Sequence, residues 1–182
     1  MRALPSTPPI LIWKVLQPRS LLRRSFVLSD LSWNDRRTLE VELPAGNGVG
    51  TARAMARAYS ALAEGGAELG LTPETFARVI APPDVPRPRD EVLGLPSYFS
   101  LGFLRPGPTV FFGSSQRAFG APGAGGSFAF ADPDARLGFA YVMNKLDFYL
   151  ADDPREKALR DAVYRGIARL TARTRTTQLA LA

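Results

Sequence analysis

Two neighbouring segments, residues 128–131 and 137–144, alternate large and small side chains, and this alternation most constrains the fold of the 182-residue chain. Phe130 and Phe139 each lie on a face of large side chains, and the opposite faces hold mainly alanine and glycine. Residues 132–135 read Asp-Pro-Asp-Ala, which predicts a turn. Because both faces are apolar, we expect an α/β chain of the α+β type. Its antiparallel sheet is flanked by helices, one of which lies close to the small-residue face.

Three helices are predicted, over residues 51–64, 72–80 and 153–170. Each begins at a side chain that can cap a helix, and the second and third continue with proline, which suits a first turn. The capping residues are Thr51, Thr72 and Asp153. The last helix is our candidate for the small-residue face because it follows the strands directly. Its expected apolar row is Leu159, Val163, Ile167 and Leu170.

Prolines and turn residues set the expected organisation of the rest. Four prolines among the first twenty residues predict an extended arm over residues 1–29, with a short strand at best. Residues 82–96 hold five prolines and predict a surface loop, whereas residues 100–104 predict a strand. The chain is thus expected to contain that arm, one partial domain over residues 30–170 and a frayed tail over residues 171–182.

The composition excludes several chemistries, because the chain has no His and no Cys. A Ser-His-Asp triad, a thiolate nucleophile and a metal held by imidazole or sulfur are therefore impossible. We predict no cofactor and no metal. No run of 18 apolar residues is present, so we expect no membrane span and a cytoplasmic location.

The net charge of +6 is concentrated near the start of the chain. Residues 1–37 carry seven basic and two acidic groups, whereas residues 38–182 carry sixteen and fifteen. A second basic group lies near the end, at Arg165, Arg169, Arg173 and Arg175. A nucleic-acid binder usually spreads its basic residues over one face among aromatic side chains, so we predict no nucleic-acid partner.

Residues 120–127 form a glycine-rich segment that can bring backbone N–H groups close to a ligand. A phosphate-binding loop would need lysine where Gly126 stands, and a dinucleotide-binding turn would need glycine where Phe128 stands. Two interpretations remain open on spacing alone. The segment is either a strand edge that lines an active site, where a backbone N–H can help bind an oxyanion, or a glycine-rich bulge that leads into a sheet.

Residues 119–144 closely resemble the last core strands of the serine beta-lactamase-like carboxylesterases, which share the fold of class C beta-lactamases and penicillin-binding proteins. Further segments resemble the same family in the same order: residues 33–35, 47–53, 93–103 and 152–165. The resemblance covers roughly residues 30–165. It implies that the chain forms the C-terminal portion of a beta-lactamase/transpeptidase-like fold.

Family members use a Ser-x-x-Lys nucleophile and base, a catalytic Tyr, and a third element of Lys-Thr-Gly or His-x-Gly form. The third element falls here at Ala121-Pro122-Gly123, where the resembling esterases usually show His-Pro-Gly. The resemblance implies that Ala124 donates its backbone N–H to the oxyanion hole and that Gly125 also lines the substrate site. No Ser-x-x-Lys is present, because Leu11, Val142 and Pro154 stand three residues before the three lysines.

We therefore expect a C-terminal part of a beta-lactamase-related serine hydrolase that is inactive alone and has no catalytic residue of its own. The intact family would transfer acyl groups from small esters or amides. The alternative is a truncated, non-enzymatic homologue with a structural or interaction role, because an exposed sheet edge favours self-association or a complementing chain. A third hypothesis is an unrelated nucleophile, Ser114 or Ser127, although no base lies nearby in sequence.

Overall fold

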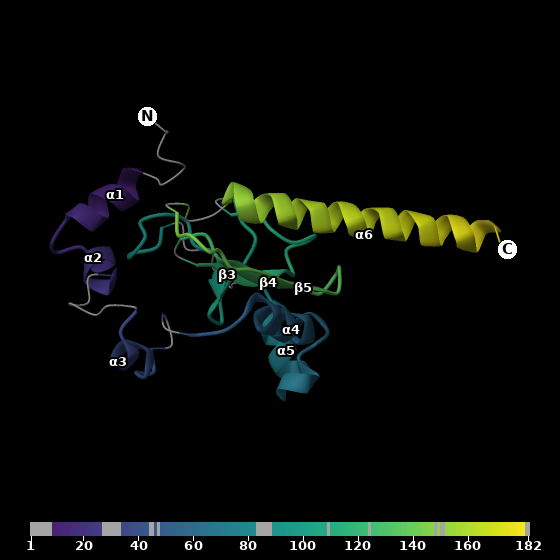
Figure 1. Cartoon of the computed structure of the whole chain (residues 1–182), viewed down its shortest axis with the longest axis horizontal. Coiled ribbons are helices and arrows are strands. Elements are labelled where there is room, and N and C mark those ends of the chain that lie inside the picture. Colours follow the sequence, from purple (N-terminus) through teal and green to yellow (C-terminus); the bar gives the residue numbers. More distant parts are fainter. Residues whose placement is uncertain are drawn as a thin grey trace.

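The computed structural model describes residues 9–26, 34–43, 46, 48–82, 89–108, 110–123, 125–147, 149 and 152–180. These form a five-stranded antiparallel sheet, of order β1-β2-β3-β4-β5, with helices on both faces (Figure 1). The helices are α1 (Pro9–Leu16), α2 (Leu21–Phe26), α3 (Arg36–Leu39), α4 (Ala52–Ala63), the 3-10 helix η1 (Ala67–Leu69), α5 (Pro73–Ile80) and α6 (Pro154–Ala180). The strands are β1 (Phe99–Ser100), β2 (Phe103–Leu104), β3 (Phe119–Pro122), β4 (Phe128–Asp132) and β5 (Leu137–Tyr141). The expected α+β sheet is thus confirmed.

The aromatic core lies on the face of the sheet toward α6. Phe130 of β4 pairs with Phe139 of β5 across the ladder, and the centroids of their rings are 5.3 Å apart. Phe112 packs edge-on against Phe128, with ring centroids 5.1 Å apart. Phe128, Phe130 and Phe139 are 4%, 0% and 8% exposed, so the alternation of large side chains correctly predicts these core residues. Phe112, which is 1% exposed, joins the core from outside the alternating segments.

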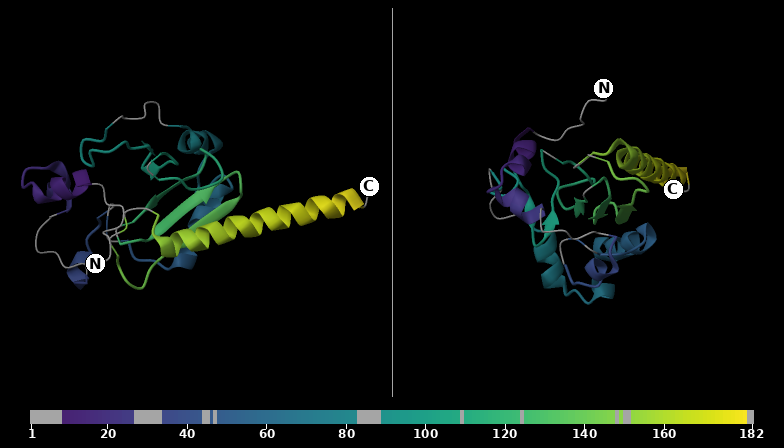
Figure 2. Two further views of the ribbon diagram at one scale, coloured as in Figure 1. Left: turned by 90° about the horizontal axis from the view of Figure 1, so that it is seen from above. Right: turned by 60° about the vertical axis from the view of Figure 1, so that its left-hand side comes forward.

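The small-residue face is covered by α4, and our assignment of the last helix to this face is wrong. A Cβ atom built on Gly138 of β5 would overlap the backbone nitrogen of Ser60 and lie 2.6 Å from the carbonyl oxygen of Ala56, both in α4. Helix α6 instead packs Val163 and Tyr164 on the aromatic face. Figure 2 shows α4 and α6 on opposite sides of the sheet. A helix does lie close to the small-residue face, as expected, but this helix is α4 and not α6.

The three predicted helix starts are confirmed by their caps. The side chains of Thr51 and Thr72 each accept a hydrogen bond from a backbone N–H three residues later, over 3.2 Å. The carboxylate of Asp153 accepts one from the N–H of Arg155 over 2.9 Å. Side-chain oxygens thus satisfy donors that the first turn of a helix leaves free.

Helix α6 runs on to Ala180, through the segment expected to form a frayed tail, and its second half projects from the body (Figure 1). Its expected apolar row is only partly correct. Leu159 is 52% and Leu170 is 65% exposed, whereas Glu156 and Arg160 are buried. The pattern failed here because an ion pair replaces apolar side chains on the buried face. The domain boundaries at residues 29 and 170 stay predictions.

The N-terminal segment is helical where we expected an extended arm. Pro9 occupies the first position of α1, where its missing N–H has no partner to lose, and Pro18 follows the end of the helix. The prolines therefore bound a helix instead of preventing it. Residues 1–8 and 27–33 of the expected arm, and residues 83–88 of the expected surface loop, lie outside the described residues.

The strand expected at residues 100–104 is a short hairpin. The strand pattern did not predict β3, which the family resemblance had placed among the core strands of residues 119–144. Leu101 and Gly102 both have positive φ, 47° and 83°, and reverse the chain between β1 and β2. β3 lies between β2 and β4 and begins the glycine-rich segment. Glycine and proline weaken the strand pattern of its sequence, Phe-Gly-Ala-Pro, so pairing with β4 determines its conformation.

Candidate functional site

The glycine-rich segment joins β3 to β4 as a tight hairpin. Ala121 and Pro122 pair with Ala129 and Phe128 of β4. The N–H of Gly123 then donates to the carbonyl oxygen of Ser127 over 2.7 Å, which closes the turn. The segment is therefore a glycine turn that leads into the sheet, as one of the two interpretations expects, and its binding of an oxyanion stays a prediction.

The structure places most of the predicted site residues on this hairpin. Ala121, Pro122, Gly123 and Gly125 are half-buried along one continuous backbone. Ala124, the candidate oxyanion donor, lies outside the described residues, so its role stays a prediction. The N–H of Gly123 is already bonded to Ser127, and Ala121 offers only a methyl group. No side chain of these four residues can transfer a proton.

An ion pair at the start of α6 holds the loop of the glycine-rich hairpin, between β3 and β4, in place. Arg155 contacts both carboxylate oxygens of Asp153, with its Nη2 atom 2.5 Å from Oδ2. Its Nη1 donates to the carbonyl oxygen of Lys145 over 2.7 Å, and its Nη2 donates more weakly to that of Gly125 over 3.4 Å. A Cβ atom on Gly126 would overlap Oδ2 of Asp153, so only glycine lets the loop lie this close.

These contacts determine how Asp153 titrates. The hydrogen bonds from Arg155 hold the pKa of Asp153 below its ordinary value, although burial of the carboxylate opposes them. Because the pKa is lower in the folded state than in the unfolded state, the pair stabilises the fold fully above about pH 4. This contribution is lost as the pH falls further, through the folded-state pKa.

We expect Asp153→Asn to destabilise the protein near neutral pH and to reduce the loss of stability on the acid side. Urea unfolding at neutral pH and below about pH 3 measures both effects. The control is Glu64→Gln, which removes the exposed ion pair with Arg136 and should cost less than about 1 kcal/mol. Equal losses for the two variants at both pH values would contradict this account.

A second ion pair lies beneath the loop, beside a small pocket. Nε of Arg160 is 2.8 Å from Oε1 of Glu156, and these side chains are 6% and 3% exposed. Arg160 also donates to the carbonyl oxygen of Phe111 over 2.6 Å and to Asp152 over 2.7 Å. Burial is the main cause that raises the pKa of Glu156, and Arg160 opposes it.

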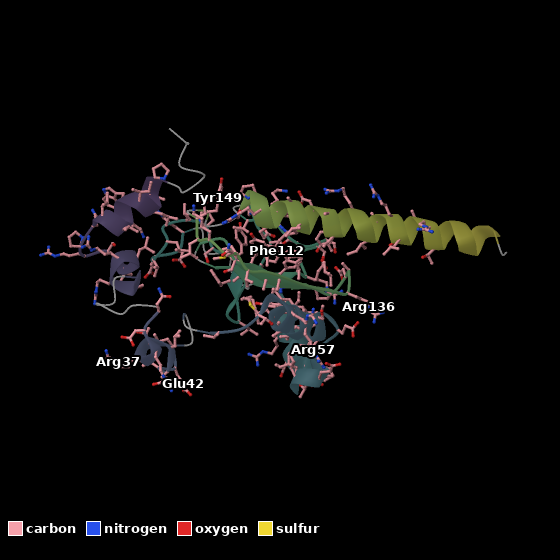
Figure 3. All side chains as sticks on the ribbon, viewed as in Figure 1. Arg37, Glu42, Arg57, Phe112, Arg136 and Tyr149 are labelled. Carbon is pink, nitrogen blue, oxygen red and sulfur yellow. The ribbon has the colours of Figure 1, made fainter. Side chains whose placement is uncertain are left out.

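The pocket beside this pair is lined by Ser127, Tyr149, Glu156 and Arg160, among others. Figure 3 shows Tyr149 and Phe112 near the start of α6. The pocket thus brings one of the two candidate serines near a carboxylate that the sequence did not place there. Its volume of about 10 Å³ admits one water molecule and no ester substrate.

Ser114, the other candidate serine, is held by a buried carboxylate. Its Oγ donates to Asp132 over 3.0 Å, and its N–H donates to the same carboxylate over 2.6 Å. The hydroxyl of Tyr164 donates to Asp132 from α6 over 2.5 Å. Burial, followed by this hydrogen bond, raises the pKa of Tyr164, which keeps the phenol protonated. The arrangement ties α6 to β4 and the loop before β3, which is a structural role.

Within the described part of the chain, no three acidic side chains gather where they could hold a metal ion. Over the same residues, no helix combines the length and apolar character needed to cross a membrane. The ion pairs of Arg155 with Asp153 and of Arg160 with Glu156 were missed in the sequence analysis. The available signal was Asp-Asp-Pro-Arg-Glu at residues 152–156, which was interpreted only as a helix cap.

Comparison with known proteins gives one consistent group. The model of the beta-lactamase family matches residues 8–163. The esterase/beta-lactamase LipL of Mycobacterium tuberculosis is 38% identical over 113 residues, which are 59% of this chain and 25% of that protein. This chain therefore spans about a quarter of the length of that curated relative.

Solved structures agree with the fold. A penicillin-binding protein homologue from Caulobacter crescentus is 37% identical, with a TM-score of 0.68 over 79% of this chain and 39% of its own. EstA from Arthrobacter nitroguajacolicus Rue61a is 35% identical, with a TM-score of 0.64 over 75% and 37%. A family VIII carboxylesterase is 38% identical, with a TM-score of 0.56 over 64% and 31%.

Proposed function

Because the chain belongs to the beta-lactamase family, we propose that it supplies one wall of a serine-hydrolase site and performs no acyl transfer by itself. In this proposal the wall is β3 with its hairpin, because the family resemblance assigns Ala121-Pro122-Gly123 to the position of the third element. The observation that carries the proposal is Ala121, because a methyl group neither donates nor accepts a proton.

The rest of the sequence supports the same proposal. Acyl transfer through a serine needs a base near the hydroxyl, and the family takes that base from Ser-x-x-Lys. None of the three lysines here has a serine at the required spacing. The intact site would act on small esters or amides, and its nucleophile, base and tyrosine would have to come from outside this sequence.

The small size of the pocket beside Ser127 supports the proposal that this chain has no catalytic site of its own. Ser127 and Glu156 share its lining, but Glu156 is paired with Arg160 and the space holds about one water molecule. Ligand pockets in proteins commonly have volumes of about 300–1,000 Å³. Ser127 is therefore no substitute for the missing nucleophile.

We expect the purified chain to remain unlabelled by a fluorophosphonate serine probe and to leave a short-chain nitrophenyl ester unhydrolysed. Mass spectrometry of the treated chain and absorbance of the released nitrophenol measure the two outcomes. An intact family VIII carboxylesterase serves as the positive control. Ala121→His restores a proton-carrying side chain but no nucleophile, so it too should stay unlabelled.

Labelling of a single serine, abolished when that serine is changed to alanine, would overturn the proposal. Ser127→Ala is the first variant to test, because Ser127 shares a pocket with a carboxylate. Ser114→Ala is the second, although the bonds between Ser114 and Asp132 predict that this change acts on stability and not on labelling.

A non-catalytic interaction role is the second candidate, and the edge of the sheet favours it. β5 pairs with β4 on one side and with no other described strand. Beyond it, Val142 and Leu146 are 43% and 71% exposed. An unpaired strand presents free N–H and C=O groups to another chain. Self-association through this edge needs none of the catalytic elements and so suits a chain without them.

A further inference from the structure

Helices α1 and α2 present an apolar surface to solvent at the end of the molecule away from the tip of α6 (Figure 2). We call this the α1–α2 surface, and its residues are Ile12, Trp13, Val15, Leu16 and Leu21. They are 42%, 54%, 46%, 69% and 46% exposed. Single exposed apolar residues are ordinary, but five of them on two helices that contact each other need a physical explanation.

The patch is fixed in its outward orientation by the opposite side of the same helices. Leu11 and Leu22 are buried, at 6% and 4% exposure. The ammonium group of Lys14 donates to the carbonyl oxygens of Glu91 and Val92, over 2.7 Å and 2.9 Å. Helix α1 is therefore anchored to the loop before β1 by one side, which leaves its other side free.

The connection between the two helices is also ordered. Ser20 caps α2 by accepting from the N–H of Arg23 over 3.1 Å, and its hydroxyl donates to the carbonyl oxygen of Lys14. This bond links the end of α1 to the start of α2. The α1–α2 surface is thus held by the fold and is not a flexible apolar tail.

Basic side chains accompany the patch, and the two helices that carry it have no acidic side chain of their own. Residues 9–26 contain Lys14, Arg19, Arg23 and Arg24 and neither Asp nor Glu. Lys14 is engaged with the loop, whereas Arg19 and Arg24 are exposed. Apolar and aromatic side chains bounded by arginine are typical of helices that lie at the boundary between anionic headgroups and acyl chains.

We propose that the α1–α2 surface binds an anionic lipid surface, with Trp13 and Leu16 in the headgroup region and Arg19 and Arg24 on the lipid phosphates. Tryptophan suits this position because its ring is apolar while its N–H can bond to polar headgroups. Each arginine near an anionic leaflet strengthens binding by about fivefold.

A second copy of the chain fits this surface less well. In a two-fold symmetric contact the same patch is present on both partners, so the surface that carries Arg19, Arg23 and Arg24 would meet another surface of the same positive charge. Like charges placed opposite one another oppose association. Negative lipid headgroups supply the complementary charge that a second copy lacks.

The full chain carrying Trp33→Phe tests the proposal, because Trp13 is then its sole tryptophan. With vesicles of phosphatidylcholine and phosphatidylglycerol we expect a blue shift of Trp13 emission and sedimentation of the protein with the vesicles. With phosphatidylcholine alone we expect neither effect. High salt should reverse the binding, because the attraction is screened.

Two sets of variants separate the contribution of the arginine charges to vesicle binding from that of the apolar side chains. Arg19→Gln with Arg24→Gln should lower partitioning by about tenfold or more, whereas Arg165→Gln with Arg169→Gln removes equal charge from α6 and should leave most of it intact. Trp13→Ser with Leu16→Ser should abolish sedimentation, while Val49→Ser with Leu146→Ser, at positions 83% and 71% exposed, should not. Circular dichroism checks that each variant is folded.

Three results would overturn the proposal. One is equal binding to neutral and anionic vesicles, which would remove the role of arginine. Another is equal loss of binding in both charge variants, which would indicate attraction by net charge. The third is a dimer in light scattering that Trp13→Ser dissolves, which would make a second copy the occupant. None of these outcomes depends on esterase activity, so the proposal stands or fails independently of the proposed function.

Discussion

Phe130→Ala is expected to lower the free energy of unfolding by about 3–5 kcal/mol, because it leaves a cavity at the centre of the aromatic core. Phe130 is 0% exposed, and its ring lies 5.3 Å or 5.4 Å from the rings of Phe112, Phe128 and Phe139. Domains of this size are commonly stable by only about 5–15 kcal/mol, so the variant should be marginally folded. Urea unfolding followed by circular dichroism measures the change.

Phe111→Ala is the matched control, because it makes the same chemical change one residue from Phe112. Phe111 is 61% exposed, so its removal should change the free energy of unfolding by no more than about 0.5 kcal/mol. Its backbone carbonyl, which accepts a hydrogen bond from Arg160, is kept in the variant. A loss of less than about 1 kcal/mol for Phe130→Ala would contradict the packing described here.

Gly138→Ala is expected to destabilise the protein by about 1–3 kcal/mol, although alanine is the smallest side chain that can be added. The new methyl group would overlap the backbone nitrogen of Ser60 in α4 and approach the carbonyl oxygen of Ala56 to 2.6 Å. Backbone atoms cannot rotate away as a side chain can, so the helix must shift from the sheet. Thermal unfolding detects the loss.

The same substitution at Gly166 should have the opposite sign. Gly166 lies inside α6, and a Cβ atom there would meet no atom within 4 Å. Alanine in a helix interior is favoured over glycine by about 0.5–1 kcal/mol, so Gly166→Ala should stabilise the protein. No loss of stability in Gly138→Ala, or an equal loss in both variants, would contradict the account in which contact with α4 makes alanine costly at residue 138.

Local rules predicted the elements that depend on local interactions. The caps at Thr51, Thr72 and Asp153 join a side chain to a backbone N–H within three residues, so the sequence around each is sufficient. The alternation over 128–144 likewise determines which side chains of β4 and β5 face the core. These features could be read without knowing where any other element lies.

The failures concern contacts between distant segments. Which helix covers the small face depends on how residues 52–63 meet residues 137–141, and no pattern within either segment contains that information. The strand β3 takes its conformation from its pairing with β4. Helix α1 was missed because proline was treated as a helix breaker, without regard to its tolerance at the first position.

The predicted site residues follow from the family resemblance and not from patterning. Spacing alone left residues 120–127 as either a bulge or the edge of a site. The structure shows two contacts that neither the spacing nor the resemblance could predict. The N–H of Gly123 donates a hydrogen bond to the carbonyl oxygen of Ser127, and Arg155 donates one to the carbonyl oxygen of Gly125. The partners of Arg155 at Lys145 and Gly125 are too far away in sequence for local periodicity to reveal them.

The contacts of Arg155 have a consequence for how the protein opens. Local fluctuations release a group of linked residues together, with a free energy set by the bonds that must break. Arg155 lies in the first turn of α6 and contacts the carbonyl oxygens of Gly125 and Lys145, so opening that turn also releases the hairpin beyond β3. The hairpin is thus ordered by its contacts with the helix, and the two form one cooperative unit. We expect the amide protons of this unit to exchange at a common rate.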